Sequence, residues 1–307
     1  MPGPLVIVNP TAGNGKVARL VPWVARRLRP MGDAELVTTR SPGHGIELAR
    51  GAAADGRRRI VAVGGDGTVQ EVASGLLSAG TPADALPVLG ILARGRGNDL
   101  ARSIGLPRRL EAAWTVAIGA PPAPLDVGRV RLAGGAVRHF VSCGGIGFDA
   151  QVAAVMARRG RSRTGAIGYL LATLAELRRF RNVEVEVSLD DDPPERSRVL
   201  LVALANGAYY GGGMRICPDA RTDDGRLDLC FVGDISRLTA LRQLPNLYRG
   251  THLRHPAVSI RHARRVRVDG DASVRVHLDG EPAGGLPIEV ELTPAALRVA
   301  APVAEGR

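Results

Sequence analysis

The strongest constraint on the fold is one short unit, "RRIVAVGGDGTVQEVASGLL", which covers residues 58 to 77. Residues 60–63 form a short, partly β-branched apolar run, which is typical of a buried strand. Residues 64–67 are three glycines and an aspartate, and they break the strand. Thr68 and Glu71 have the spacing of a capping box, so we expect a helix that begins at Thr68.

The start of this helix is suited to an anion. Apolar residues follow at helical spacing, at Val69, Val72, Ala73, Leu76 and Leu77. The first turn of a helix has free backbone N–H groups and a partial positive charge, and glycines let a phosphate approach the backbone. A plain strand-to-helix turn explains the glycines equally well. Asp66, however, would repel a bare phosphate unless a metal or a sugar hydroxyl lies between them, so it favours a nucleotide with a divalent ion.

Strand and helix patterns alternate over the first 106 residues. The strand patterns lie at 5–8, 34–39, 58–65 and 87–93, and the helical ones at 16–28, 45–56, 68–78 and 98–106. This alternation predicts an α/β domain with a doubly wound parallel sheet. Ligands of such sheets bind beyond the carboxyl ends of the strands, where "NPTAGNGK", "VTTRSPG", "GGDGT" and "ARGRGND" are found.

From about Pro124 the pattern changes to short alternating strands with Gly, Asp and Pro turns. It predicts a mostly antiparallel β domain, interrupted by helices near 149–181 and 236–249. The sequence "APPAP" at 120–124 is the predicted linker. We therefore expect domains at 1–123 and 124–307, and the last residues belong either to the second domain or pack back on the first.

The chain has 307 residues and a net charge of +11, with Lys16 as its single lysine, so its basic residues are almost all arginines. Such a charge indicates an anionic partner, namely a nucleotide, an anionic lipid or a nucleic acid. The arginines are spread along the whole chain, so coding bias explains them as well. Aromatic residues make up 3%, which disfavours base stacking and hence nucleic acid.

Three further features concern the compartment. Cys143, Cys217 and Cys230 have neither metal-site nor disulfide-framework spacing, so we expect buried, reduced thiols in a cytoplasmic protein. The first residues read as a strand and not as a signal peptide. The apolar segment "TGAIGYLLATLAEL" is too short to span a bilayer, so any membrane contact is expected to be peripheral.

Two common nucleotide motifs are excluded. In "NPTAGNGK" the first P-loop glycine would fall at Pro10, and Val17 occupies the position of the magnesium-binding Ser or Thr. The stretch "GGDGTV" also lacks the G-x-G-x-x-G spacing of dinucleotide-binding folds.

Six blocks nevertheless occur in an order typical of one enzyme family. They are "NPTAGNGK", "VGGDGTVQEV", "RGNDLARSIGLP", "CGGIGFDAQV", "NGAYYGGGMRICPDARTDDGRLDL" and "HLDGEP". In this series, which runs from about residue 5 to 300, the chain resembles the diacylglycerol-kinase-type lipid kinases, including bacterial lipid kinases and the sphingosine and ceramide kinases. "GGDGT" alone is shared with the NAD kinases, whereas the full series is specific.

The resemblance implies a fold and a nucleotide site. The fold is an α/β domain like that of NAD kinases and diacylglycerol kinases, followed by an antiparallel β-sandwich with helical insertions, and ATP lies in the cleft. The resemblance implies that phosphates are held by Gly64, Gly65, Asp66, Gly67 and Thr68. It also implies that Asn9 and Thr39 line the nucleotide site, and it places Asn98 and Asp99 in the matching "ND" block.

The resemblance further implies a proton acceptor and a metal loop. Glu281 in "LDGEP" matches the acceptor of the substrate proton. "DDGRLDL" matches a metal-binding loop, with Asp224 as ligand through its carboxylate and Arg221 and Arg226 through backbone carbonyls. Asp66 can serve Mg²⁺, which prefers oxygen ligands and bridges phosphates. Ordinary Asp-Gly turns account for the same residues without any function.

Arg96 departs from the family, which has threonine at this place in "GTxND". Its guanidinium would pair with a phosphate more strongly than a hydroxyl does, or it would block the nucleotide, and both outcomes stay open.

A lipid-facing surface is a further hypothesis. Arginines flank an apolar helix that contains Tyr169, Leu170, Leu171 and Leu174, which suits anionic lipid headgroups. A helix packed on the core explains the pattern too. In the same way, "NGAYYGGGMRICP" suits either an acyl channel or a bulge in a sheet.

The sequence thus predicts an ATP- and Mg²⁺-dependent kinase that phosphorylates a hydroxyl of diacylglycerol or a related membrane lipid. We expect it in the cytoplasm, at the membrane surface as a peripheral protein, with a homodimer as an open alternative. Two rivals remain, a kinase of a soluble metabolite of the NAD-kinase type and an inactive protein that binds anionic lipid or nucleotide.

Overall fold

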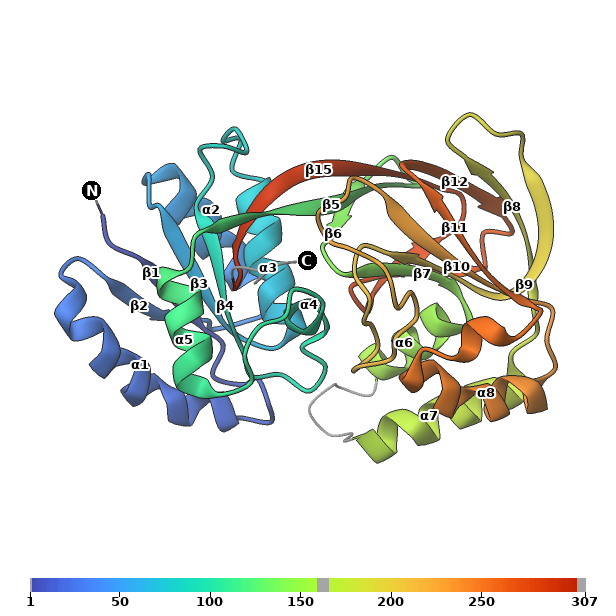
Figure 1. The fold of residues 1–307 in the computed structure, drawn as a ribbon, viewed down its shortest axis with the longest axis horizontal. Coiled ribbons are helices and arrows are strands. Elements are labelled where there is room, and N and C mark those ends of the chain that lie inside the picture. The colour runs from blue at the N-terminus through green and yellow to red at the C-terminus, as the bar shows by residue number, and fades with distance from the viewer. Residues whose placement is uncertain (1, 159–165, 303–307) are drawn as a thin grey trace. The chain divides into compact units, whose positions relative to one another are not determined.

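The computed structural model describes residues 2–158 and 166–302, with the side chains of 166–172 left out. It divides the chain into two compact units, unit 1 with Met1–Asp126 and Pro294–Arg307, and unit 2 with Val127–Thr293 (Figure 1). The sequence placed the boundary three residues earlier. The expected linker "APPAP" enters a strand at Pro122, and residues 294–307 count with unit 1.

Unit 1 contains a parallel sheet. Its strands are β1 (Leu5–Val8), β2 (Glu35–Thr38), β3 (Arg59–Gly64) and β4 (Val88–Ala93), in the spatial order β2-β1-β3-β4. The end of β15 (Ile288–Ala300) adds to β4 through the pair Val299 and Leu89. The predicted doubly wound α/β domain is confirmed, and all four strands end at the same edge.

Helices cover both faces of this sheet (Figure 1). They are α1 (Val21–Leu28), α2 (His44–Ala54), α3 (Asp66–Leu77), α4 (Asp99–Ser103) and α5 (Leu110–Gly119), with 3₁₀ turns η1 (Lys16–Leu20) and η2 (Arg29–Met31). Trp23 of α1 and Trp114 of α5 pack edge to face, with ring centroids 5.5 Å apart. Gly75 of α3 lets α2 approach, because a Cβ there would lie 2.4 Å from the Ile46 carbonyl oxygen.

The sequence analysis missed α5. The helix packs against β4 at Gly90, where a Cβ would lie only 2.3 Å from the carbonyl oxygen of Ala117. Its sequence, "LEAAWTVAIG", is apolar nearly all round, so it has no clear amphipathic period to reveal it.

Unit 2 is built mainly of antiparallel strands. They are β5 (Pro122–Leu132), β6 (Val137–Phe140), β7 (Cys143–Gly147), β8 (Val183–Leu189), β9 (Glu195–Ala205), β10 (Leu227–Gly233), β11 (Val258–Ala263), β12 (Arg265–Gly270), β13 (Arg275–Leu278), β14 (Glu281–Gly285) and the first part of β15. The ladders β5–β6, β7–β9, β7–β13, β8–β9, β8–β12, β9–β10, β10–β11, β12–β15 and β13–β14 are all antiparallel. The predicted sandwich-like β domain is confirmed.

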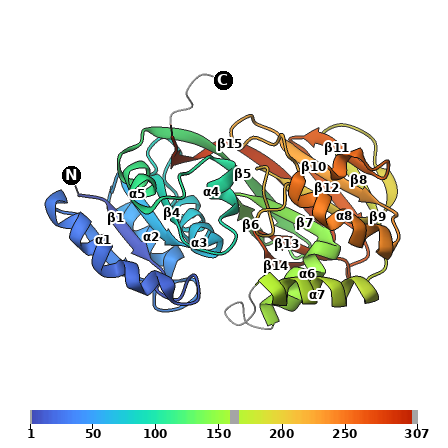
Figure 2. The same cartoon turned by 60° about the horizontal axis from the view of Figure 1, so that its bottom comes forward.

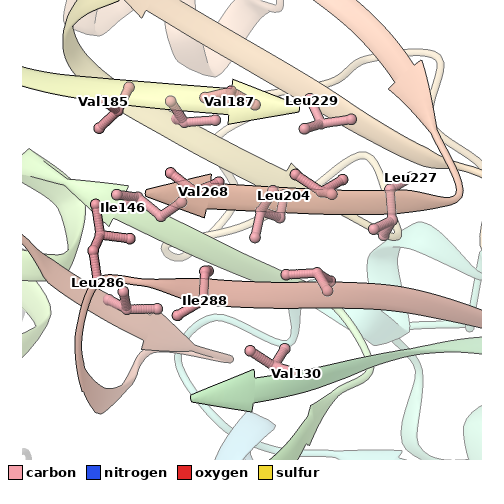
Figure 3. Close-up of a cluster of buried hydrophobic side chains, with 14 of the residues drawn as sticks. Val130, Ile146, Val185, Val187, Leu204, Leu227, Leu229, Val268, Leu286 and Ile288 are labelled. Carbon is pink, nitrogen blue, oxygen red and sulfur yellow. The ribbon is translucent and has the colours of Figure 1, made fainter. Parts of the chain in front are cut away.

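Alternating side chains on β9 and β10 build two cores in unit 2. Val202 of β9 belongs to the core of the β-sandwich. Leu204 of β9 and Leu229 of β10 point into the same core, where side chains from several strands meet (Figure 3). Their sequence neighbours, such as Ala203 and Cys230, point to the opposite face. Both strands are therefore buried on both faces.

Helices cover that opposite face. They are α6 (Phe148–Arg158), α7 (Ala166–Arg179) and α8 (Arg237–Arg249), followed by the 3₁₀ turn η3 (His252–Arg254), and α6, α7 and α8 lie together in Figure 2. Both predicted helical insertions are confirmed. The three cysteines are buried and free of disulfides, as the sequence predicts.

Candidate active site

Four of the predicted loops lie at the carboxyl edge of the unit 1 sheet, because the strands that precede them run parallel. Hydrogen bonds of the ladder continue past the strand ends into these loops. Asn9 N–H donates to the Val63 carbonyl at 3.0 Å, Thr39 N–H to Val8 at 2.9 Å, and Arg94 N–H to Gly64 at 2.6 Å. The backbone thus brings Asn9, Thr39, the glycine turn and the loop that begins at Arg94 to one edge.

The turns after β3 and β4 touch through glycine backbone. A Cβ on Gly65 would lie 3.0 Å from the Cα of Gly95, and a Cβ on Gly95 would lie 2.4 Å from the Cα of Gly65. No side chain fits at Gly95 without a shift of the backbone. The two turns therefore form one continuous backbone surface, and the first turn of α3 contributes its unpaired N–H groups to it.

Asp66 joins these turns by its side chain. One carboxylate oxygen accepts the N–H of Asn98 and the other accepts the N–H of Asp99, each at 2.7 Å. Gly97 leaves room for this contact, since a Cβ there would lie 2.7 Å from the carboxylate. Asp66, the first residue of α3, therefore holds the start of α4 and needs no metal to explain its presence.

Asn98 closes the loop after β4. It has a left-handed backbone with φ 55°, and its side-chain oxygen accepts the N–H of Gly95 at 2.8 Å. Its side-chain amide donates back to the Gly95 carbonyl at 3.2 Å. Asn tolerates this conformation better than most residues, which gives Asn98 a local structural role.

The predicted capping box is wrong. The helix begins at Asp66, two residues before Thr68, and Gly65 is its N-cap without a side-chain bond. The Thr68 hydroxyl instead accepts the side-chain amide of Asn9 at 3.0 Å. The Glu71 carboxylate accepts the backbone N–H groups of Gly43 and Gly45 at 3.0 and 3.1 Å, so it caps the neighbouring α2. Both side chains therefore form tertiary hydrogen bonds in place of the local capping box.

Two more predicted residues line the same edge. The Thr39 hydroxyl makes no hydrogen bond within the described part of the chain, and the residue is only partly exposed. The exposed Arg96 donates from its guanidinium to the side-chain oxygen of Asn14, so it ties the loop after β4 to the loop after β1.

In unit 2, Glu281 follows a two-residue hairpin turn. Asp279 and Gly280 both have positive φ, 47° and 76°, and Leu278 pairs with Glu281 across the turn. This is the Asp-Gly hairpin that the sequence suggested as the plain explanation. Glu281 itself begins β14 and is partly buried.

Polar contacts that the sequence did not reveal fix this hairpin. The Asp279 carboxylate accepts the N–H groups of Val141, Ser142 and Cys143 at 2.9 to 3.0 Å. His277 accepts the Gly280 N–H through Nδ1 at 3.2 Å. The turn that precedes Glu281 is therefore fixed by the hydrogen bonds of both Asp279 and His277.

The other nitrogen of His277 lies against a buried carboxylate. Its Nε2 lies 3.3 Å from Asp149 at the start of α6, and both side chains are more than 90% buried. Because Nδ1 is an acceptor, Nε2 carries the proton and donates it to Asp149. Gly145 makes the space, since a Cβ there would lie 2.1 Å from the Asp149 carboxylate.

The predicted metal loop forms a tight turn. Asp224 accepts the N–H of Arg226 at 3.1 Å through one oxygen, Gly225 has φ 75°, and the Arg221 side chain donates to Asp223. Among the residues that the structure describes, no three His, Cys, Asp or Glu side chains form a metal cluster.

Negative charge gathers near this loop at Asp228. Burial, with smaller contributions from the neighbouring Asp224 and Asp219, raises the pKa of its carboxyl to about 6. His262, whose ring nitrogen lies 3.2 Å away, opposes the shift.

Asp126 is a buried carboxylate that the sequence analysis did not single out. It is 2% exposed and accepts the N–H of Ala295 at 2.7 Å. A signal existed in the sequence, because an aspartate within the apolar run "PLDVGRV" is unusual.

Two other predicted features concern the lipid. Tyr169, Leu170 and Leu171 lie outside the described side chains. The glycines at 211–213 form a turn that is closed by the bridge between Tyr210 and Met214.

Both parts of the chain match known family models. Residues 4–130 match the diacylglycerol kinase catalytic domain, and residues 142–301 match the YegS C-terminal NAD kinase beta sandwich-like domain. The chain therefore belongs to the diacylglycerol-kinase-type family of lipid kinases, and it is a kinase.

Individual relatives span nearly the whole chain. A diacylglycerol kinase of Mycobacterium tuberculosis is 32% identical over 96% of this chain and 94% of its own length. A diacylglycerol kinase of Bacillus subtilis is 30% identical over 92% of this chain and 91% of its own length.

Solved structures share the fold. One from Bacillus anthracis str. Sterne is 27% identical, with a TM-score of 0.76 over 98% of this chain and 95% of its own. A second, a diacylglycerol kinase from the same organism, is 22% identical with a TM-score of 0.72, over 98% and 97% of the two chains. Within the described residues, no helix is both long and apolar enough to cross a membrane.

The Asp66 contacts predict a local effect of substitution. In Asp66→Asn the side-chain amide turns an N–H group toward a backbone donor, and the charge-assisted bonds are lost. We expect hydrogen exchange at the Asn98 and Asp99 amides to speed up about tenfold or more, because bonds to charged groups contribute about 1.5–3 kcal/mol. Asp55→Asn at the end of α2 is the control. Unchanged exchange at residues 98 and 99 would show that Asp66 does not hold this loop.

Proposed function

We propose that this kinase transfers the γ-phosphoryl group of ATP to a hydroxyl of diacylglycerol or a related membrane lipid. The observation that carries the proposal is the joined backbone surface of Gly65 and Gly95, set at the carboxyl edge of the sheet and next to the first turn of α3. Such a surface lets a chain of phosphates approach the unpaired N–H groups at the start of α3 without side chains in the way.

Within unit 1, we assign the nucleotide contacts as follows. The turn from Gly64 to Thr68 holds the phosphates, and Asn9 and Thr39 lie beside it at the same edge. Arg96 is exposed at the rim, so its guanidinium is available to approach a phosphate once it leaves Asn14. Asn98 shapes the loop from which Arg96 projects.

Mg²⁺ would join this site through oxygen ligands. Each oxygen of Asp66 accepts one N–H, and a carboxylate oxygen has a second lone pair, so Asp66 fits a cation as well. Bound there, the ion would neutralise charge on the phosphates.

In the transfer itself, we assign Glu281 as the proton acceptor. The hydroxyl oxygen of the lipid forms a bond to the γ-phosphorus as the bond to the β,γ-bridging oxygen breaks, ADP leaves, and the hydroxyl proton passes to Glu281. The hairpin that carries Glu281 is fixed by Asp279 and His277, which suits a base that must keep its position.

A kinase assay with labelled ATP and detergent micelles of diacylglycerol tests the proposal, with the product identified by mass. We expect labelled phosphatidic acid from the wild type, and a loss of about 10²–10⁴-fold in kcat for Glu281→Gln, because a general base contributes that much. Glu291→Gln, an exposed acid of the same unit, should match the wild type.

Two results would contradict the proposal. In the first, no lipid in a total extract becomes labelled, and label appears in NAD⁺ instead. In the second, Glu281→Gln retains full activity, which would remove the assigned base while leaving the lipid substrate intact.

We also propose a divalent cation at the loop of residues 221–226, held by the Asp224 carboxylate and the carbonyl oxygens of Arg221 and Arg226. The donors are all oxygens, as Mg²⁺ and Ca²⁺ prefer, and Asp219 and Asp228 add negative charge nearby. Millimolar Mg²⁺ should raise the midpoint of thermal unfolding of the wild type, and Asp224→Asn should abolish the rise. An equal rise of the unfolding midpoint in the wild type and in Asp224→Asn would contradict a cation site at this loop.

A further inference from the structure

Helix α8 exposes apolar side chains to an unusual degree. Four large apolar side chains are exposed among the described residues, and three of them lie on α8: Leu238 at 55%, Leu241 at 41% and Tyr248 at 50%. The fourth is Val137 on β6. One helix thus carries three of these four side chains, and exposed apolar side chains gathered on one element indicate an interaction face.

The opposite face of α8 is already used. Ala240 is buried and Leu247 packs against the core that lies on β9 and β10, so these residues dock the helix onto unit 2. Leu238 and Leu241 project the other way, from positions three residues apart. Figures 1 and 2 show α8 beside α7, at the surface of unit 2. The exposed stripe is therefore additional to what the fold requires.

Arginines surround this stripe without acidic partners. Residues 235–268 contain no aspartate or glutamate, so the helix and the segment after it are purely cationic. The strand residues Arg261, Arg265 and Arg267 pair with carboxylates from elsewhere. Arg242 and Arg249 of α8, and Arg254 just after it, are exposed and form no ion pair within the described part of the chain.

A cavity opens at the end of the same helix. Its volume is about 480 Å³, within the roughly 300–1,000 Å³ range of small-ligand pockets. Its lining includes Arg249, Arg254, His255 and Thr251. Nδ1 of His255 accepts the Ala257 N–H at 3.2 Å, so Nε2 carries a proton that it can donate. The rest of the lining is Gln243, Asn246 and Pro256, so the cavity has two arginines and no carboxylate, which suits a phosphate ester.

We propose that this surface, made of the exposed stripe of α8 and the cavity at its end, docks on a bilayer of anionic phospholipid. Leu238 and Leu241 enter the acyl boundary, and Arg249, Arg254 and His255 bind one phosphate headgroup. The choice of a bilayer rests on the proposed lipid substrate, and charge complementarity selects an anionic one. The surface differs from the segment around Tyr169 that the sequence suggested.

Vesicle co-sedimentation without ATP tests the proposal. We expect the wild type to bind vesicles of phosphatidylglycerol and phosphatidylcholine more tightly than vesicles of phosphatidylcholine alone, and less tightly as salt rises. The double variant Arg249→Gln/Arg254→Gln should weaken partitioning about thirtyfold. The variant Leu238→Ser/Leu241→Ser should weaken it about tenfold.

Matched controls remove the same groups elsewhere. Arg26→Gln/Arg50→Gln removes two exposed arginines of α1 and α2, and Val137→Ser removes the exposed apolar side chain of β6. Both should partition within about twofold of the wild type, since they leave the charges and apolar side chains of the proposed docking surface intact. All the substituted side chains are exposed, so unfolding midpoints should stay unchanged, which separates lost docking from lost folding.

Three outcomes would overturn the proposal. In the first, the wild type and the α8 variants bind vesicles equally. In the second, the wild type binds equally well with and without phosphatidylglycerol. In the third, Leu238→Ser/Leu241→Ser changes from dimer to monomer while its vesicle binding stays intact. The last would show that a second copy covers the face. The micelle assay keeps the two proposals apart, since a protein that binds vesicles but phosphorylates no lipid would contradict the proposed function alone.

Discussion

The contact that the rest of unit 1 depends on is the bridge between the turns after β3 and β4. Gly65 and Gly95 touch through backbone atoms, and the carboxylate of Asp66 takes the first N–H groups of α4. The contact forces glycine at two positions and an acid at a third. It also sets the start of α3 beside the start of α4, and the unpaired N–H groups of the first turn of α3 face this edge.

In unit 2, hydrogen bonds in the same way fix the hairpin that carries the proposed base. Asp279 satisfies three backbone N–H groups of residues 141–143, and the buried pair of His277 and Asp149 supports the turn from the other side. A carboxylate at the start of β14 thus gains a fixed position from groups that do no chemistry themselves. Preorganisation of this kind is what phosphoryl transfer demands of a protein.

The sequence predicted those elements whose conformation depends on residues close together in the chain. The apolar runs of β1, β3 and β4 and the Asp-Gly turn before Glu281 follow from short stretches of sequence, and they were predicted. The prediction of a capping box was wrong because the side chains of Thr68 and Glu71 accept hydrogen bonds from Asn9 and Gly43, which are distant in sequence. The partners of Asp66 and His277 likewise come from segments 32 and 128 residues away, which no local pattern reveals.

The most direct test of the account is a titration of the ¹⁵N-labelled protein with Mg²⁺ and ATP, followed by the amide resonances. The account predicts that the amides of Gly65, Gly67 and Gly95 shift most and saturate together, because they surround the phosphates. Saturating shifts confined to other parts of the chain, with these three amides unmoved, would contradict the assignment of this edge as the nucleotide site.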